Sequence, residues 1–92
     1  MTVEHPIGVT NKQGVHARPS SMIVRCAMEF AADVKIRNDD TGFEADAKSP
    51  LEVMMLNAPC GTQLTIIGSG DDAQAAVDAI KALIEAGFNE DD

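Results

Sequence analysis

"NKQGVHARPS", residues 11–20, separates two stretches of different periodicity. Before it, in residues 2–10 ("TVEHPIGVT"), the mainly apolar residues at odd-numbered positions alternate with other residues at even-numbered positions. This period of two predicts a strand. After it, the apolar residues of 17–30 recur at helical spacing. Pro19 is tolerated only in the first turn of a helix, where its missing N–H is no loss. The helix is therefore predicted to begin at about Ala17.

The remaining elements follow from the same two periodicities. In chain order they are two strands at 33–37 and 42–46, a short helix at 49–56, a strand at 62–68 and a helix at 70–87. Pro6 cannot donate to a ladder, so the first strand should be an edge strand. The order βαββαβα predicts an α+β fold with one sheet and helices on one face. We treat residues 1–92 as a single domain with a frayed tail at 89–92.

Capping signals mark the ends of the last two helices. Ser49 followed by Glu52 makes a capping box, and Pro50 suits the first helical position. The acids at 71–72 suit the positive end of the last helix dipole, and Gly87 suits its C-terminal stop. These signals place the two helices independently of their hydrophobic pattern.

The composition limits the classes of partner. The 92-residue chain has a formal net charge of −8, which argues against nucleic acid because a phosphate backbone selects basic surfaces. The charge is uneven, since residues 5–28 hold no acid while 71–92 are strongly acidic. No apolar run is long enough to insert into a membrane, and no signal peptide is visible. We therefore expect a cytoplasmic protein with free thiols, Cys26 in the core and Cys60 in a loop.

His16 and Arg18 stand where the first helix begins, inside the acid-free segment. A helix N-terminus leaves backbone N–H groups unpaired and carries a partial positive charge, so it attracts anions. The Arg18 side chain adds a donor suited to phosphoryl oxygens, and the expected phosphate contacts are Ala17 and Arg18. These positive neighbours disfavour the imidazolium, and a neutral imidazole can attack phosphorus. The pattern predicts catalytic roles for His16 and Arg18.

Other interpretations stay open. A histidine at a helix start can simply cap the helix or face solvent, and an isolated H-x-R triplet would favour that interpretation. A pure interaction module with the same fold is a second alternative. A metal site is disfavoured because the spacings of the candidate ligands match no compact metal motif; these are His5, His16, Cys26 and Cys60. An independent enzyme is disfavoured because the loop offers no acid–base partner for His16.

The run "NKQGVHARPSS", residues 11–21, together with residues 47–88, resembles HPr, the histidine-containing phosphocarrier of the sugar phosphotransferase system; its "GVHARP" is the specific signature. The resemblance covers nearly the whole chain and implies an open-faced β-sandwich, a four-stranded antiparallel sheet with three helices on one face. It also implies that enzyme I passes a phosphoryl group from phosphoenolpyruvate to Nδ1 of His16, beside Arg18. An enzyme IIA-type domain then takes the group. On this basis we expect a monomeric phosphocarrier without a cofactor, a metal or independent turnover.

The resemblance also implies a regulatory position and a partner surface. Ser49 falls where HPr kinase phosphorylates a serine in some relatives, although its capping role is complete without any kinase. The expected partner-binding residues are Ser20, Pro50, Leu51 and Met54. Pro50 and Glu52 depart from the family, in which the first position is more often aliphatic and the second often basic. These departures leave open whether the chain serves sugar transport or a nitrogen-type regulatory chain.

Overall fold

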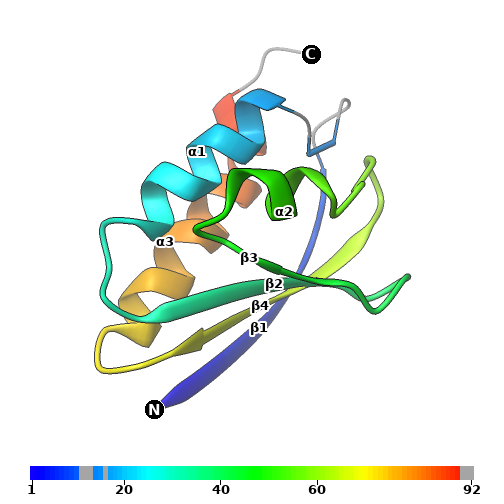
Figure 1. Ribbon diagram of the computed structural model, residues 1–92. Helices are drawn as coiled ribbons and strands as arrows, with labels where there is room; N and C mark the ends of the chain where they lie inside the picture. Colours follow the sequence, from blue (N-terminus) through cyan, green and yellow to red (C-terminus); the bar gives the residue numbers. More distant parts are fainter. Residues whose placement is uncertain (11–13, 16, 90–92) are drawn as a thin grey trace.

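The computed structural model describes residues 1–10, 14–15 and 17–89 (Figure 1). Its elements, in chain order, are β1 (Thr2–Gly8), α1 (Ala17–Ala27), β2 (Asp33–Asn38), β3 (Glu44–Asp46), α2 (Pro50–Met54), β4 (Gln63–Ser69), α3 (Ala73–Glu85) and a final 3-10 turn, η1 (Gly87–Asn89). The predicted βαββαβα order is confirmed, and α1 begins at Ala17 as predicted.

The strands form one four-stranded antiparallel sheet in the order β1-β4-β2-β3. β1 lies at an edge, as Pro6 predicted. It pairs with β4 along its whole length, from Thr2 opposite Ser69 to Gly8 opposite Gln63. Because β1 ends opposite the start of β4, the segment that follows β1 and the segment that precedes β4 lie side by side.

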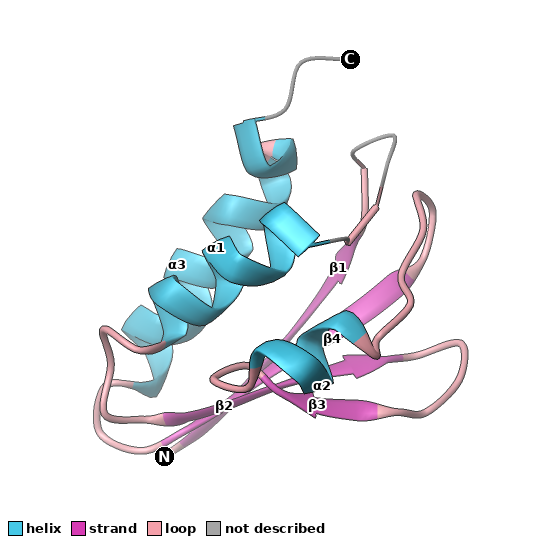
Figure 2. Ribbon diagram, turned by 45° about the horizontal axis from the view of Figure 1, so that its top comes forward, coloured by secondary structure: helices cyan, strands magenta, loops and turns pink. Residues whose placement is uncertain are grey.

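Helices α1, α2 and α3 cover one face of the sheet, and the other face is open (Figure 2). The burial pattern of β2 follows from this arrangement, because Val34, Ile36 and Asn38 are buried while the residues between them are more exposed. The core between the two layers is aliphatic, and Phe88 is completely buried in it. The open-faced β-sandwich that the resemblance implied is confirmed.

α1 ends at Ala27, earlier than the predicted end at Phe30. The N–H of Glu29 donates to the carbonyl of Cys26 at 3.2 Å, a tightened bond that is typical of a helix end. The Nζ of Lys48 donates to the carbonyl oxygen of Phe30 at 2.9 Å. The apolar residues at helical spacing therefore continue past the helix, into a turn that Lys48, between β3 and α2, binds.

Half of the predicted capping box is present at the start of α2. The N–H of Glu52 donates to the Oγ of Ser49 at 3.4 Å, and Pro50 opens the helix. The reciprocal bond is replaced, because the Glu52 carboxylate accepts from the N–H of Asp46 at 3.0 Å. The N–H of Ser49 donates instead to the carbonyl of Asp46 at 2.9 Å. The prediction of a complete capping box was therefore wrong.

The structure confirms the prediction for one end of α3 and changes the role expected at the other. Asp72 is the N-cap residue, but its carboxylate makes no capping bond to α3. It accepts instead from the N–H groups of Ala31 at 2.9 Å and Ala32 at 2.7 Å, in the loop after α1. Gly87 follows the other end with a φ of 63°, the left-handed conformation in which glycine commonly ends a helix. The predicted stop is confirmed, whereas Asp72 serves the loop after α1 through hydrogen bonds.

Candidate functional site

His16 lies outside the described residues, so the site is defined by its neighbours in the chain. Gly14 and Val15 precede it, and α1 begins directly after it with Ala17. The first turn of α1 holds no acidic residue, so the partial positive charge of the helix start is not neutralised there. Position 16 therefore stands at the anion-attracting end of an eleven-residue helix.

Gly14 fits tightly against the loop that precedes β4. Its φ of 69° is left-handed, and a Cβ added to it would lie 2.7 Å from the Cα of Pro59. The N–H of the next residue, Val15, donates to the carbonyl of Ala58 at 2.8 Å. Position 14 therefore requires glycine for its conformation and for its close contact, and the backbone just before His16 is held at a fixed place.

The same loop also holds the chain where it leaves β1. The N–H of Val9 donates to the carbonyl of Thr62 at 2.9 Å, and the N–H of Gly61 donates to the carbonyl of Val9 at 2.8 Å. Residues 57–62 thus bond to the chain on both sides of the segment 11–13. The sequence did not lead us to expect that this loop supports the site. Gly61 was the residue that could have indicated it, because glycine favours turns with a positive φ, and its φ here is 95°.

Arg18 lies in the first turn of α1, as expected, and its exposed side chain reaches the other end of the described chain. Its Nη2 donates to the backbone carbonyl of Phe88 at 2.9 Å. The guanidinium and the start of α1 therefore contribute positive potential to the same region. No sequence pattern signals the contact with Phe88, because the two residues are 70 positions apart.

Ser20 does not belong to an exposed surface. It is 2% exposed, and its Oγ is buried without a hydrogen-bond partner in the described part of the chain. Ser20, Ile23 and Ala27 are all buried and follow one another at helical spacing, so they form the core-facing side of α1. This burial counts against the predicted partner-binding role of Ser20.

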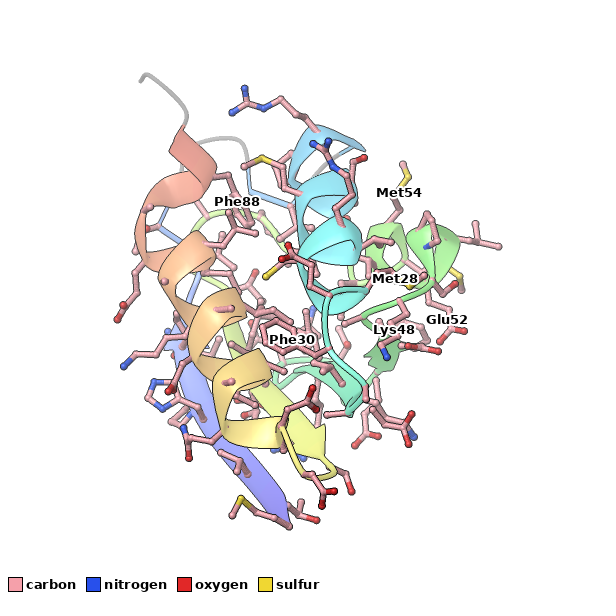
Figure 3. The ribbon with its side chains drawn as sticks, turned by 90° about the vertical axis from the view of Figure 1, so that its left-hand side faces the viewer. Met28, Phe30, Lys48, Glu52, Met54 and Phe88 are labelled. Atoms are coloured by element: carbon pink, nitrogen blue, oxygen red, sulfur yellow. The ribbon has the colours of Figure 1, made fainter. Side chains whose placement is uncertain are left out.

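Large apolar side chains are exposed around α2. Leu51, Met54 and Met55 have exposed fractions of 71%, 51% and 56%, and Met28, just after α1, has 64%. Figure 3 shows Met28 and Met54 on the same side of the molecule. We call these four residues the apolar patch; Pro50 beside them is also exposed. The outward orientation predicted for Leu51 and Met54 is confirmed, and the contributions of Met28 and Met55 were missed.

Both cysteines are free. Cys26 is half-buried in α1 rather than fully in the core, and burial, followed by the nearby Glu29, raises the pKa of its thiol. Cys60 is exposed as expected, and its Sγ donates to the carbonyl of Thr10 at 3.7 Å. Within residues 1–10, 14–15 and 17–89, no group of three or more His, Cys, Asp or Glu residues could hold a metal ion. The helices of this described part include none long and apolar enough to span a membrane.

Comparisons with known proteins point to one family. The model of PTS-HPr, described as "PTS HPr component phosphorylation site", matches residues 3–86. The chain is 38% identical over 91 residues to phosphocarrier protein NPr of Escherichia coli (strain K12), covering 99% of this chain and 100% of that one. It is 36% identical over 85 residues to phosphocarrier protein HPr of Treponema pallidum, covering 92% and 94% of the two chains.

Solved structures agree with this match. The crystal structure of HPr-C-His from Thermoanaerobacter tengcongensis has a TM-score of 0.89 and 32% identity, covering 97% of this chain and 98% of that one. The phosphocarrier protein HPr of Bacillus anthracis has a TM-score of 0.84 and 35% identity, covering 90% and 96%. The chain therefore belongs to the HPr family of phosphocarrier proteins of the phosphotransferase system.

Proposed function

We propose that this chain is a phosphoryl carrier that accepts a phosphoryl group on His16 from phospho-enzyme I. It then passes the group to an enzyme IIA-type domain and has no turnover of its own. The observation that carries the proposal is the start of α1, which follows His16 directly, contains Arg18 and lacks an acid in its first turn. We propose further that the carrier works in the cytoplasm as a monomer and needs no cofactor.

The neutral imidazole of His16 is the nucleophile in this proposal. As the lone pair of its Nδ1 forms a bond to phosphorus, the bond between phosphorus and the donor protein breaks. The phosphoryl oxygens then meet the N–H groups at the start of α1, at Ala17 and Arg18, and the Arg18 guanidinium. These contacts stabilise the phosphorylated carrier only moderately, because a carrier must release the group as well as accept it.

The apolar patch is the proposed docking surface for enzyme I and for the acceptor domain. A soluble protein that exposes neighbouring large apolar side chains commonly uses them for contact with a partner. Methionine suits this role because its flexible, polarisable side chain adapts to surfaces of different shape. Leu51 and Met54 are the central members, Pro50 extends the surface, and the buried Ser20 is left out of it.

A nitrogen-type phosphotransferase chain is the favoured setting for the carrier. Relatives named phosphocarrier protein NPr from Escherichia coli, Klebsiella oxytoca and Shewanella violacea are 38%, 37% and 39% identical to this chain. Pro50 and Glu52, which depart from the pattern of the family, lie in the proposed docking helix and allow a partner other than the usual one. We therefore propose that the donor is the enzyme I of a nitrogen-type chain rather than that of sugar transport.

Intact-protein mass after incubation with phosphoenolpyruvate, Mg²⁺ and enzyme I tests the carrier role. One acid-labile phosphoryl group is expected on the wild type and on His5→Ala, and none on His16→Ala. His5→Ala is the matched control because the chain has only two histidines. Phosphorylation that survived in His16→Ala and vanished in His5→Ala would overturn the site assignment. Faster acceptance from a sugar-type enzyme I than from a nitrogen-type one would overturn the proposed setting.

Ser49 is a proposed regulatory site for an HPr kinase/phosphorylase. It is half-buried at the start of α2, and its hydroxyl accepts a long capping bond of 3.4 Å from Glu52. A phosphate there would replace a weak cap and would lie near the positive end of the helix. Incubation with the kinase and ATP should add one acid-stable phosphate to the wild type and to Ser21→Ala, but none to Ser49→Ala. No addition to the wild type would remove Ser49 from the proposal.

A further inference from the structure

Three of the five methionines of the chain lie in the apolar patch, and all three are exposed. Met28, just after α1, is 64% exposed, and Met54 and Met55, at the end of α2, are 51% and 56% exposed. Figure 3 shows Met28 and Met54 on the same side of the molecule, and α1 and α2 pack against each other. Three thioether side chains are therefore open to solvent on one surface.

The fold does not depend on these side chains. The core-facing side of α2 is formed by Val53 and Leu56, which are 0% and 1% exposed, whereas Met54 and Met55 between them are exposed. A polar group added to either methionine would therefore stay in water instead of being buried without a hydrogen-bond partner. A chemical change on this surface alters what a partner protein meets and leaves the core intact.

We propose that Met28, Met54 and Met55 form a modification site, at which oxidation to methionine sulfoxide weakens docking and a methionine sulfoxide reductase restores it. The inference rests on the proposed carrier function, because it takes the apolar patch as the docking surface for enzyme I. It goes beyond that function, since it makes the availability of the carrier depend on the peroxide concentration.

The oxidant is a peroxide, and one molecule of it is consumed for each methionine. With hydrogen peroxide, the sulfur lone pair attacks one oxygen, the O–O bond breaks and a sulfur–oxygen bond forms. Sulfur loses two electrons, and the displaced hydroxide takes the proton of the transferred oxygen and leaves as water. A reductase reverses the step with a dithiol, which becomes a disulfide while its two protons and the sulfoxide oxygen leave as water.

The sulfoxide changes the property that makes the patch suitable for docking. It converts a flexible apolar side chain into a polar and chiral one. A partner that covers the sulfoxide must remove the water bound to its oxygen, and this costs binding free energy unless the partner offers a hydrogen-bond donor there. The same flexible surface serves every partner in the proposed function, so oxidation should weaken docking to all of them.

The other oxidisable side chains provide internal controls. Met22 is half-buried in α1, where it lines a groove between α1 and α3 together with Cys26. Burial raises the pKa of the Cys26 thiol and so disfavours its reactive thiolate form. Met1 is 78% exposed, but it precedes β1, at the sheet edge opposite β3, against which α2 packs. Met22 therefore controls for burial, and Met1 controls for exposure outside the patch.

Peptide mapping by mass spectrometry after brief treatment with hydrogen peroxide tests the modification site. Sulfoxide should form on Met28, Met54 and Met55 several-fold faster than on Met22, because the half-buried side chain is less accessible to the oxidant. Circular dichroism of the oxidised chain should show an unchanged fold. Oxidation of Met22 as fast as that of the other three, or loss of the fold on oxidation, would overturn the inference.

Calorimetric titration with enzyme I, after the peroxide is removed, tests the effect on docking. The Kd of the oxidised chain should be about tenfold higher than that of the untreated chain, and a methionine sulfoxide reductase with its dithiol should restore it. The triple variant Met28→Leu, Met54→Leu, Met55→Leu keeps an apolar surface without sulfur. Its Kd should be the same before and after peroxide treatment. An equal rise in this variant would assign the effect to another residue, such as the exposed Cys60, and overturn the inference.

The two proposals fail differently. An untreated chain that neither binds enzyme I nor accepts a phosphoryl group refutes the carrier function, and with it the effect of oxidation on docking. A chain that binds enzyme I equally well before and after complete oxidation of Met28, Met54 and Met55 keeps the carrier function and refutes only the inference drawn from the methionines.

Discussion

The carboxylate of Asp72 lies 2.7 Å from the backbone nitrogen of Ala32 and accepts its hydrogen bond. The other carboxylate oxygen accepts from the N–H of Ala31 at 2.9 Å. Backbone donors favour the ionised form, so the pKa of Asp72 is lowered, chiefly by the bond from Ala31. Through this contact the residue before α3 holds the loop that follows α1.

Asp72→Ala should lower the melting temperature at neutral pH because two backbone donors lose their partner. The folded pKa lies below the ordinary value of 3.8, so the carboxylate contributes stability that is complete above that value and is lost as pH falls through the folded pKa. The difference in melting temperature between wild type and variant should therefore shrink as the solution is acidified. Circular dichroism melts across a pH series measure it.

Asp71→Ala is the matched control, since it removes the same charge from the exposed neighbouring residue. It should show a smaller difference at neutral pH. If Asp72→Ala and Asp71→Ala behaved alike at every pH, the two bonds would contribute nothing beyond their charge.

The strands and helices could be predicted because their signals are local. Alternating side chains mark β1, and Pro19 marks the start of α1. The end of α1 could not be predicted in the same way, because Lys48 and Asp72 bind the following turn from distant parts of the sequence. The local sequence pattern therefore predicts the start of an element more clearly than its end, because tertiary contacts can decide where the element ends.

The candidate site also contains some features that the local sequence predicts and others that depend on tertiary contacts. Residue types and spacing were enough to expect Arg18 in the first helical turn and Leu51 on the surface. The burial of Ser20 depends on which side of α1 meets the sheet, and the Phe88 carbonyl reaches Arg18 only after the whole chain has folded. Neither relationship leaves a mark in a short stretch of sequence.

Ser20→Ala should stabilise the fold. The Ser20 hydroxyl is buried without a partner in the described residues, and an unpaired buried polar group costs about 1–3 kcal/mol. Removing it should raise the free energy of unfolding by about 1 kcal/mol while phosphoryl acceptance stays unchanged. Urea denaturation and the mass assay measure the two effects.

Ser21→Ala separates this effect from helix propensity, because Ser21 is exposed in the same helix. Both variants gain from alanine as a helix former, by roughly 0.5 kcal/mol. Only Ser20→Ala should gain more than that. A loss of stability in Ser20→Ala would mean that the hydroxyl has a partner, and the prediction would be refuted.

Gly14→Ala should weaken both the fold and phosphoryl acceptance. A Cβ there would stand 2.7 Å from the Cα of Pro59 on a backbone with a φ of 69°, so the loop that supports the site must shift. Conformational strain of this kind costs about 1–3 kcal/mol, and the contact with Pro59 adds to it. Gly42→Ala is the control, because its φ is 81° and nothing lies within 4 Å of the added atom. If the two variants lost equal stability in urea denaturation and transferred phosphoryl groups equally well, the contact with Pro59 would have no role.

Polar substitution in the apolar patch should weaken docking without changing the fold. Leu51 and Met54 are 71% and 51% exposed, so replacing both with serine removes little buried surface. If they contact enzyme I, the double variant should raise KM for phospho-enzyme I by about tenfold, while kcat at saturation is retained because the chemistry at His16 is intact. Ile67→Ser is the matched control, since Ile67 lies half-exposed in β4 and its strand partner Lys35 is exposed. A KM that rose equally in the control, or a folded double variant with an unchanged KM, would move the docking surface elsewhere on the molecule.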